Sequence, residues 1–175
     1  MLVAEADFFS SQGNCWTARQ AAEFSVVNVH AMEIPAPPPR IFPELSARDL
    51  LAHGPIWKLL LGLRVAVGKI FNWDPNLRDP VPQGKGFEQG KYFGFFRVIY
   101  LDAPREVGLA VENRLTKALM TWVLEENPAG TRVFNVTCAN FKGRGGKIYW
   151  RVIRPFHDGL IEDSLQTLRG RVLHH

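Results

Sequence analysis

The residues best suited to chemistry lie together near the C-terminus, in the segment "WRVIRPFHDG" at residues 150–159. In a helix, Arg154 and His157 share one face, and Asp158 pairs with Arg154 at a spacing of four residues. An imidazole titrates near neutral pH, so His157 could donate a proton or a hydrogen bond to a ligand. The alternative is a structural histidine that binds a backbone group freed by Pro155.

Pro155 lies inside a helix-like run that ends near residue 168. A proline inside a helix removes one backbone hydrogen bond and clashes with the preceding turn, so we expect a kink or local unwinding there. On a helical wheel, the apolar residues before Pro155 and those after it point in different directions. We interpret Pro155 as the point at which one long helix is re-aimed to follow a curved sheet.

Glu112, near the end of an expected strand, is a second candidate for acid-base chemistry. No second carboxylate accompanies it at a recognisable spacing. The sequence has no G-x-S-x-G, H-E-x-x-H or C-x-x-C motif, and its two cysteines, Cys15 and Cys138, have no metal-ligand spacing. We therefore expect no metal and no cofactor, and leave open whether the protein is an enzyme.

Aromatic side chains that carry one polar atom make suitable walls for a ligand cavity, although they are equally common in ordinary cores. Tyr149 begins the C-terminal helix, Trp122 lies within an expected strand, and an apolar helix carries Trp57 and Arg64. The candidate ligand-binding residues are Trp57, Arg64, Trp122, Tyr149, Arg154 and His157.

The composition is that of an ordinary globular protein, with 175 residues, 46% of them hydrophobic and 22% charged. The net charge of +4 is scattered along the chain, so we expect no nucleic-acid partner. The most apolar stretch, residues 56–73, is interrupted by three basic residues, which argues against a membrane-spanning helix. Its polar face is narrow, so we expect burial rather than membrane contact. The first residues do not form a secretory signal, and we expect a cytoplasmic protein with reduced cysteines.

Residues 1–22 show no clear period and are interpreted as an irregular or partly helical N-terminal arm. The β-branched segment "EFSVVNVHAMEI" predicts a first strand, and the proline run "PAPPPR" is expected to end it without entering a helix. Two helices are expected next, a short one capped by Ser46 and a longer one over residues 56–73. A loop rich in proline, glycine and aspartate follows.

Strand-like runs separated by turn signals occupy residues 91–141. In the last run, "TRVFNVTCANF", alternate residues fall on opposite faces of a sheet. The order of strand, two helices, antiparallel strands and one long helix predicts an α+β fold. We expect residues 23–175 to form one domain, in which a curved antiparallel sheet wraps around a kinked C-terminal helix and encloses a cavity.

The segment "GKIYWRVIRPFH" resembles a bacterial family of domains of unknown function, and "PIWKLLLGLRVAV" resembles it more weakly. That family also occurs fused to short-chain-dehydrogenase-like domains. It is similar to the START-like, or SRPBCC, helix-grip superfamily of ligand-binding proteins, polyketide cyclases and lipid carriers. The resemblance covers about residues 24–170 and implies a helix-grip fold with a hydrophobic cavity.

We therefore expect the protein to bind a small apolar or amphipathic molecule, of the lipid or polyketide kind, between its sheet and its C-terminal helix. Two alternatives stay open. One is an enzyme of cyclase or isomerase type that uses His157 or Glu112 as acid or base. The other is an interaction module that forms a homodimer.

Overall fold

The computed structural model describes residues 3–47, 50, 54–56, 58–59, 62, 65–66, 86–94 and 96–174. Within these ranges the strands are β1 (Val26–Ile34), β2 (Tyr92–Phe93), β3 (Phe96–Asp102), β4 (Glu106–Glu112), β5 (Thr116–Asn127) and β6 (Gly130–Phe141). The helices are α1 (Val3–Gln12), α2 (Trp16–Ala21), α3 (Pro38–Ile41), the 3-10 helix η1 (Phe42–Ser46) and α5 (Gly143–His174).

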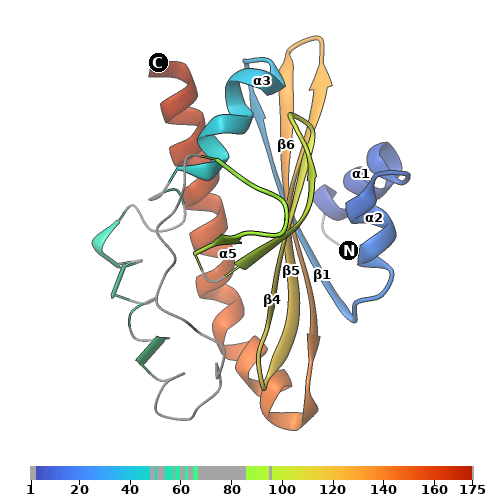
Figure 1. The fold of residues 1–175 in the computed structure, drawn as a ribbon, viewed down its shortest axis with the longest axis vertical. Helices are drawn as coiled ribbons and strands as arrows, with labels where there is room; N and C mark the ends of the chain where they lie inside the picture. The colour runs from blue at the N-terminus through green and yellow to red at the C-terminus, as the bar shows by residue number, and fades with distance from the viewer. Residues whose placement is uncertain are drawn as a thin grey trace.

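The six strands form one antiparallel sheet in the order β1-β6-β5-β4-β3-β2. Strands β3 to β6 follow one another as the predicted meander, and β1 pairs with β6 at the far edge. The sheet curves beside α5, which lies along one face (Figure 1). The predicted α+β fold, with an antiparallel sheet and a long C-terminal helix, is confirmed. The single strand expected over residues 91–101 is split into β2 and β3 by a turn at Gly94, where φ is 62°.

The proline run after β1 does enter a helix, so that expectation is wrong. Pro38 is the first residue of α3, where its missing N–H would have no helical partner and its fixed φ suits the helix. Ser46 Oγ donates a hydrogen bond to the Pro43 carbonyl at the end of η1. The two helices expected between residues 47 and 73 fall largely outside the described residues.

Of the two expectations for the N-terminal segment, irregular or partly helical, the helical one holds, and α1 and α2 pack on the outer face of the sheet, opposite α5 (Figure 1). Phe8 is fully buried there, with its ring centroid 5.3 Å from that of Phe134. The Glu106 carboxylate accepts hydrogen bonds from the backbone N–H groups of Trp16 and Thr17, at 3.3 Å and 2.6 Å. These contacts fix both helices to the sheet.

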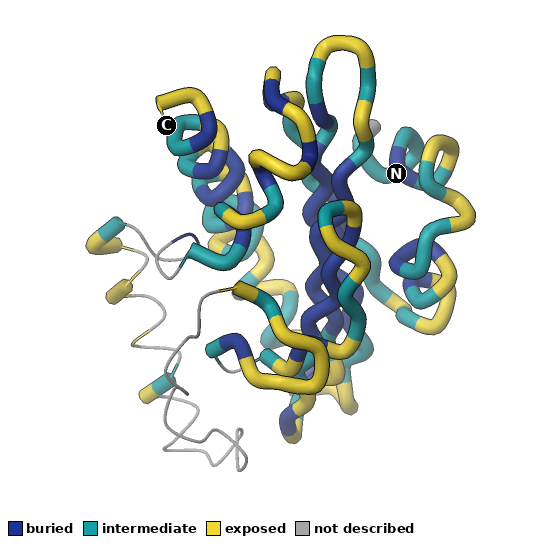
Figure 2. Tube along the Cα trace, turned by 45° about the horizontal axis from the view of Figure 1, so that its top comes forward, coloured by how far each residue is buried: buried dark blue, intermediate teal, exposed yellow. Residues whose placement is uncertain are grey.

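Figure 2 marks buried positions along the central strands and along the helices on both sides of the sheet. Their side chains form two clusters, one on each face of the sheet. The inner cluster joins Trp122 and Leu109 of the sheet to Leu165 of α5. The outer cluster joins Phe8 of α1 to Phe134 of β6. The alternation expected in β6 is confirmed, since residues 134, 136 and 138 lie in the outer cluster while residue 133 lies in the inner one.

Helix α5 runs through Pro155 without interruption, so local unwinding is absent there. Ile148 and Val152, which the wheel placed inward, are each 64% exposed. Inward positions belong instead to Trp150, whose ring stacks on Phe141 of β6, and to His157, whose ring contacts Thr137 of β6. With these two residues included, the inward stripe advances by three or four residues at a time and keeps its direction past Pro155. Its members are Gly146, Trp150, Ile153, His157, Ile161, Leu165, Leu168 and Val172.

Candidate functional site

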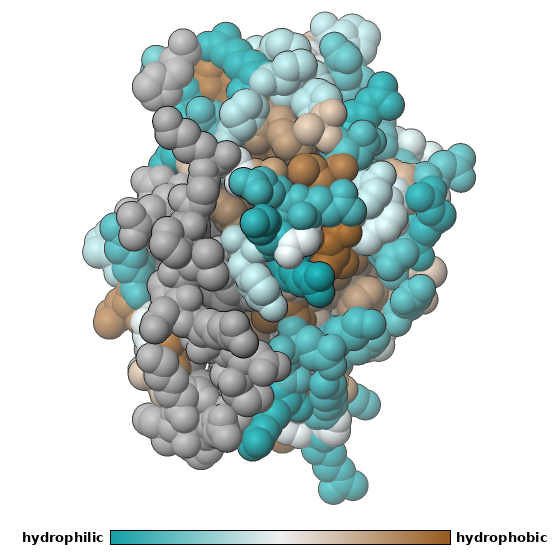
Figure 3. All heavy atoms as spheres, in the orientation of Figure 1, coloured by the Kyte–Doolittle hydropathy of each residue, from teal (hydrophilic) through white to brown (hydrophobic). Residues whose placement is uncertain are grey.

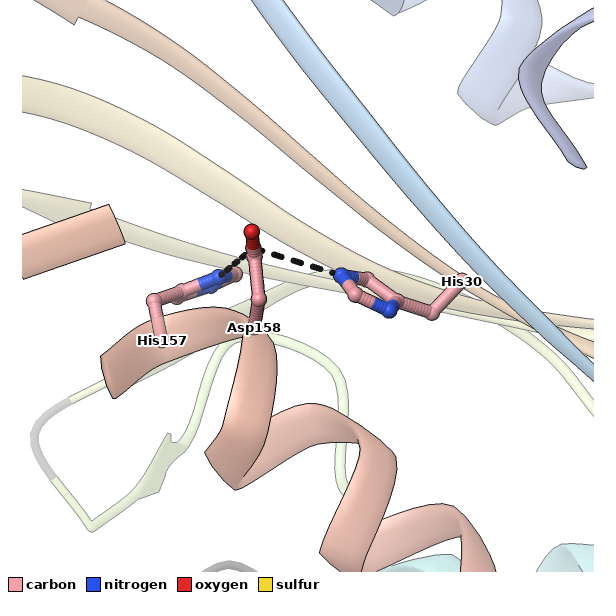
Figure 4. A group of neighbouring side chains, drawn as sticks. All are labelled: His30, His157 and Asp158. Atoms are coloured by element: carbon pink, nitrogen blue, oxygen red, sulfur yellow. Dashed lines mark hydrogen bonds and ion pairs between the residues drawn. The ribbon is translucent and has the colours of Figure 1, made fainter. Parts of the chain in front are cut away.

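A polar cluster lies between the inner face of the sheet and the middle of α5. Figure 4 shows His30 of β1 and His157 and Asp158 of α5 pointing toward one another across the gap. Asp158 Oδ1 lies 3.4 Å from His30 Nε2 and 3.5 Å from His157 Nδ1. One carboxylate oxygen therefore stands between two imidazole rings.

Three more polar side chains of the inner face adjoin this group. Asn28 Nδ2 donates a hydrogen bond of 2.6 Å to Asp158 Oδ1. Thr137 Oγ1 lies 3.2 Å from His157 Nε2 and donates a longer bond of 3.4 Å to Asn135 Oδ1. These contacts connect β1, β6 and α5 through side chains alone.

The sheet register explains why these residues meet. Side chains alternate between the two faces of a strand, so Asn28 and His30 both point inward from β1. Thr137 and Asn135 do the same from β6, and the register pairs Asn28 with Thr137 and His30 with Asn135. The two strands thus present a square of four polar side chains to α5.

Two charged residues of α5 lie at the solvent side of the cluster. Arg154 Nε is 3.6 Å from Asp158 Oδ2, so the predicted pair at a spacing of four residues is confirmed. Glu162 Oε1 is 3.9 Å from His30 Nδ1. Both side chains are largely exposed, and such pairs contribute little to stability.

Burial and hydrogen bonding set the charges of the cluster. Burial lowers the pKa of the His157 imidazole, and this effect outweighs the opposing influence of Asp158. Partial burial alone would raise the pKa of the Asp158 carboxyl, but the hydrogen bond from Asn28 and the neighbouring imidazoles together lower it. Near pH 7 a neutral His157 therefore stands beside an ionised Asp158.

Two amide atoms of the cluster are buried without a hydrogen-bond partner among the described residues, Asn28 Oδ1 and Asn135 Nδ2. The two residues are 3% and 0% exposed. Turning the Asn135 amide over would exchange the unpaired atom rather than remove it, because the Thr137 hydroxyl can face only one end of the amide. An unpaired buried polar atom costs about 1–3 kcal/mol. The cluster thus keeps one acceptor and one donor for another molecule.

The structure brings together some of the predicted site residues. His157 and Arg154 belong to the cluster. Trp122 is buried on the same inner face and pairs with Asn135 in the register of β5 and β6. Tyr149 is half-buried near the start of α5. Of these four residues, Trp122 and His157 lie between sheet and helix, whereas Arg154 lies at the solvent side of the cluster.

Other predicted residues lie elsewhere. Glu112 is exposed at the end of β4, where its Oε1 is 2.8 Å from Lys142 Nζ, and this hydrogen bond lowers the pKa of the carboxyl. Its carboxylate is therefore engaged with a lysine rather than with the histidine cluster. Trp57 and Arg64 fall outside the described residues.

The sequence interpretation missed the part of the site that β1 supplies. Asn28 and His30 are polar residues at alternate positions of an otherwise apolar strand, and they share the face that points to α5. Polar residues at alternate positions on a covered face of a sheet could have indicated a site. The pairing of β1 with β6, which brings them to His157, links distant parts of the chain and has no local signal.

The fold and the cluster define a class of protein: an α+β domain whose antiparallel sheet grips a long C-terminal helix, with a histidine and carboxylate cluster between them. Residues 20–163 match the family described as "Protein of unknown function (DUF2867)". The chain belongs to this family, which confirms that its family is one of domains of unknown function.

Solved structures of bacterial proteins share the fold. An uncharacterised protein from Rhizobium leguminosarum is 16% identical, with a TM-score of 0.54 over 86% of this chain and 95% of that one. A protein from Rhodobacter sphaeroides is 12% identical, with a TM-score of 0.51 over 85% of this chain and 99% of that one. At such identities the likeness shows the fold alone.

No curated protein sequence matches the chain. A search of the described helices for a membrane span found none that is both long enough and apolar enough.

Proposed function

We propose that the protein binds a small apolar or amphipathic molecule between the inner face of its sheet and α5. The polar group of that molecule would pair with the amides of Asn28 and Asn135. The observation that carries the proposal is the pair of unpartnered amide atoms on this face, because folding alone gains nothing from them.

The buried side chains beside these amides have the matching apolar character. In the register of β5 and β6, Asn135 adjoins Trp122 and Thr137 adjoins Met120. The inner face therefore changes from polar on β1 and β6 to apolar on β5 and β4, where Leu109 continues the apolar row. A ligand with a polar head and an apolar body would fit this order of side chains.

The resemblance to the START-like helix-grip superfamily supports the same proposal, since that superfamily contains lipid carriers and polyketide cyclases. In Figure 3, hydrophobic side chains gather near the centre of the view, beside the segment that leads into β2. The two cysteines are unpaired, which suits the reducing cytoplasm in which we place the protein.

An enzyme of cyclase or isomerase type is the second candidate, because burial keeps the His157 imidazole neutral and able to accept a proton. Both of its ring nitrogens already face partners, Thr137 at 3.2 Å and Asp158 at 3.5 Å. A substrate would have to displace one of them. We therefore rank ligand binding without catalysis above an enzymatic function.

The first test is native mass spectrometry of the freshly purified full chain. We expect a mass increment from a co-purified small molecule, which is lost when the protein is denatured. After removal of that molecule, titration with cis-parinaric acid, an amphipathic fluorescent probe, should show one saturable site.

Two matched variants locate that site. Asn135→Leu removes an inner-face amide and should weaken probe binding roughly tenfold, the value of one or two hydrogen bonds. Thr121→Val alters a buried polar residue of the neighbouring strand β5 whose side chain points to the outer face. This variant should bind the probe as tightly as the unmodified chain does. Absence of any co-purified molecule and of saturable probe binding would refute the proposal, as would equal binding by both variants.

A further inference from the structure

We propose that His30, His157 and Asp158 bind one divalent metal ion of the zinc kind. The ion would stand at the polar end of the proposed ligand site, so the inference deepens the proposed function. It is nevertheless tested with metal alone. The three ligand atoms are His30 Nε2, His157 Nδ1 and Asp158 Oδ1, and they lie within 4.8 Å of one another.

The distances from Asp158 Oδ1 to the two imidazole nitrogens match those between neighbouring ligands of one metal ion. Zinc binds imidazole nitrogen and carboxylate oxygen at about 2.0–2.2 Å, so neighbouring ligand atoms of a tetrahedral site lie about 3.3–3.6 Å apart. Asp158 Oδ1 lies 3.4 Å and 3.5 Å from the two imidazole nitrogens. A hydrogen bond between such groups would be about 2.7–3.2 Å long. Two of the three edges already have the required length, and the two imidazole nitrogens lie within 4.8 Å of each other. Asn28 Nδ2 lies 2.6 Å from Asp158 Oδ1 and 3.3 Å from His30 Nε2, so this amide must turn away from His30 when the ion binds.

Each ligand also has a partner for the polar atom that would not touch the metal. His157 Nε2 faces Thr137 Oγ1 at 3.2 Å, and His30 Nδ1 faces Glu162 Oε1 at 3.9 Å. The second oxygen of Asp158 faces Arg154. Metal-binding histidines almost always donate their other N–H to such an acceptor, which fixes the ring and its tautomer. The Thr137 contact is already close to hydrogen-bond length, whereas the Glu162 carboxylate must approach His30 Nδ1 by about 1 Å to make the second one.

An independent observation points to the open side of this site. Asn28 Nδ2 binds Asp158 Oδ1, while its Oδ1 is buried without a partner in the described part of the chain. Three protein ligands leave the fourth position of a tetrahedral ion for water or for a ligand group. Asn28 adjoins the metal ligand Asp158, so its unpaired oxygen could accept a hydrogen bond from whatever fills that position.

This proposal revises the expectation of no metal, which rested on sequence spacing alone. His30 comes from the first strand, whereas His157 and Asp158 are adjacent in the last helix. No short motif contains all three. The competing explanation is a polar cluster that only ties β1 to α5, and it makes different predictions.

The experiment uses the full chain carrying His174→Ala and His175→Ala, which removes the adjacent histidines at the end of the sequence as an adventitious site. We expect uptake of one equivalent of Zn²⁺ in competition with a chromophoric chelator, at roughly micromolar affinity or tighter. Co²⁺ in the same site should give the intense visible absorption of a four-coordinate ion. No uptake, or the weak spectrum of six-coordinate Co²⁺, would overturn the proposal.

Single variants then assign the ligands. His30→Gln and Asp158→Asn should each weaken Zn²⁺ binding at least tenfold. Thr137→Val, which removes the partner of His157 Nε2, should weaken it about 10–100-fold. Asp163→Asn, a change of the same chemical kind on the same helix, is the control and should bind as the parent does. Equal binding by all four variants would contradict the assignment.

A measurement on the parent protein guards against misfolded variants. The imidazole ¹⁵N signals of His30 and His157 should shift together on addition of one equivalent of Zn²⁺, and a shift confined to the remaining histidine, His53, would refute the site. Cis-parinaric acid binding is measured in parallel. If the metal does not bind but the probe does, only the metal inference fails; if the metal binds and the probe does not, only the proposed ligand fails.

Discussion

Both faces of the sheet are covered by helices, but buried polar groups are hydrogen-bonded to a different extent on the two faces. On the outer face, the buried carboxylate of Glu106 receives two backbone N–H groups at the start of α2. On the inner face, Asn28 and Asn135 each keep one amide atom without a partner in the described residues. The outer face has one comparable atom, the hydroxyl oxygen of Thr17.

This difference indicates that the outer face mainly stabilises the fold, whereas the inner face carries the proposed binding site. Apart from the Thr17 hydroxyl, the buried outer side chains described meet apolar neighbours and satisfied hydrogen bonds, as expected of residues that mainly hold α1 and α2 in place. The inner face combines a comparable apolar cluster with polar groups that folding does not satisfy. Local violations of packing rules are expected at functional sites. Substitutions on the outer face should therefore lower the free energy of unfolding, whereas substitutions of the inner polar residues should weaken ligand binding.

The largest effect is expected from Phe8→Ala on the outer face. Phe8 is fully buried against Phe134, and removing a buried phenylalanine costs about 3–5 kcal/mol. Urea unfolding measures the change in the free energy of unfolding. Phe9→Ala, at a half-buried position of the same helix, is the control and should cost less. If the folded Phe8→Ala protein lost cis-parinaric acid binding, the two faces would not be independent.

A smaller effect is expected from Gly108→Ala, also on the outer face. A Cβ at Gly108 would lie 2.5 Å from Trp16 Cζ3, and the Trp16 ring is stacked on Tyr100 with centroids 4.5 Å apart. Displacing this stack should cost about 1–3 kcal/mol in unfolding free energy. Gly170→Ala is the control, because that position in α5 has open space and should gain about 0.5–1 kcal/mol. Equal effects of the two substitutions would show that the ring does not press on Gly108.

The predictability of the two faces from sequence also differs. The meander and the alternation of β6 follow from local periodicity, and the contribution of α5 to the site follows from helical spacing at Arg154, His157 and Asp158. For β1 the only local signal is the pair of polar residues Asn28 and His30 at alternate positions, because the pairing of Asn28 with Thr137 joins segments that lie far apart in the sequence. The register between strands that are distant in sequence is set by the whole sheet, so it cannot be predicted from a short sequence segment.

The inward stripe of α5 was misassigned for a different reason. The wheel counted aliphatic residues as core and so placed Ile148 and Val152 inward, while Trp150 and His157 occupy that face. Tryptophan and histidine are amphipathic, and at a polar site they take core positions that a hydrophobicity count gives to aliphatic residues. The apparent change of direction at Pro155 came from the polar site itself.

The smallest and sharpest test replaces one buried polar residue by leucine on each face. Asn135→Leu removes the unpaired amide nitrogen Nδ2 and the Oδ1 atom that accepts a hydrogen bond of 3.4 Å from Thr137. The leucine side chain has a similar volume. The free energy of unfolding should stay unchanged or rise by about 1 kcal/mol. Glu106→Leu leaves the N–H groups of Trp16 and Thr17 without their acceptor and should lower it by about 1–3 kcal/mol.

Urea unfolding of both variants, with cis-parinaric acid titration of each, decides between two explanations of the inner amides. If Asn135 serves binding, Asn135→Leu keeps its stability and loses affinity, whereas Glu106→Leu loses stability and keeps its affinity while folded. If the inner cluster only ties β1 to α5, Asn135→Leu is destabilised as much as Glu106→Leu. That second pattern would remove the contrast between the faces, and with it the physical basis for placing the binding site on the inner one.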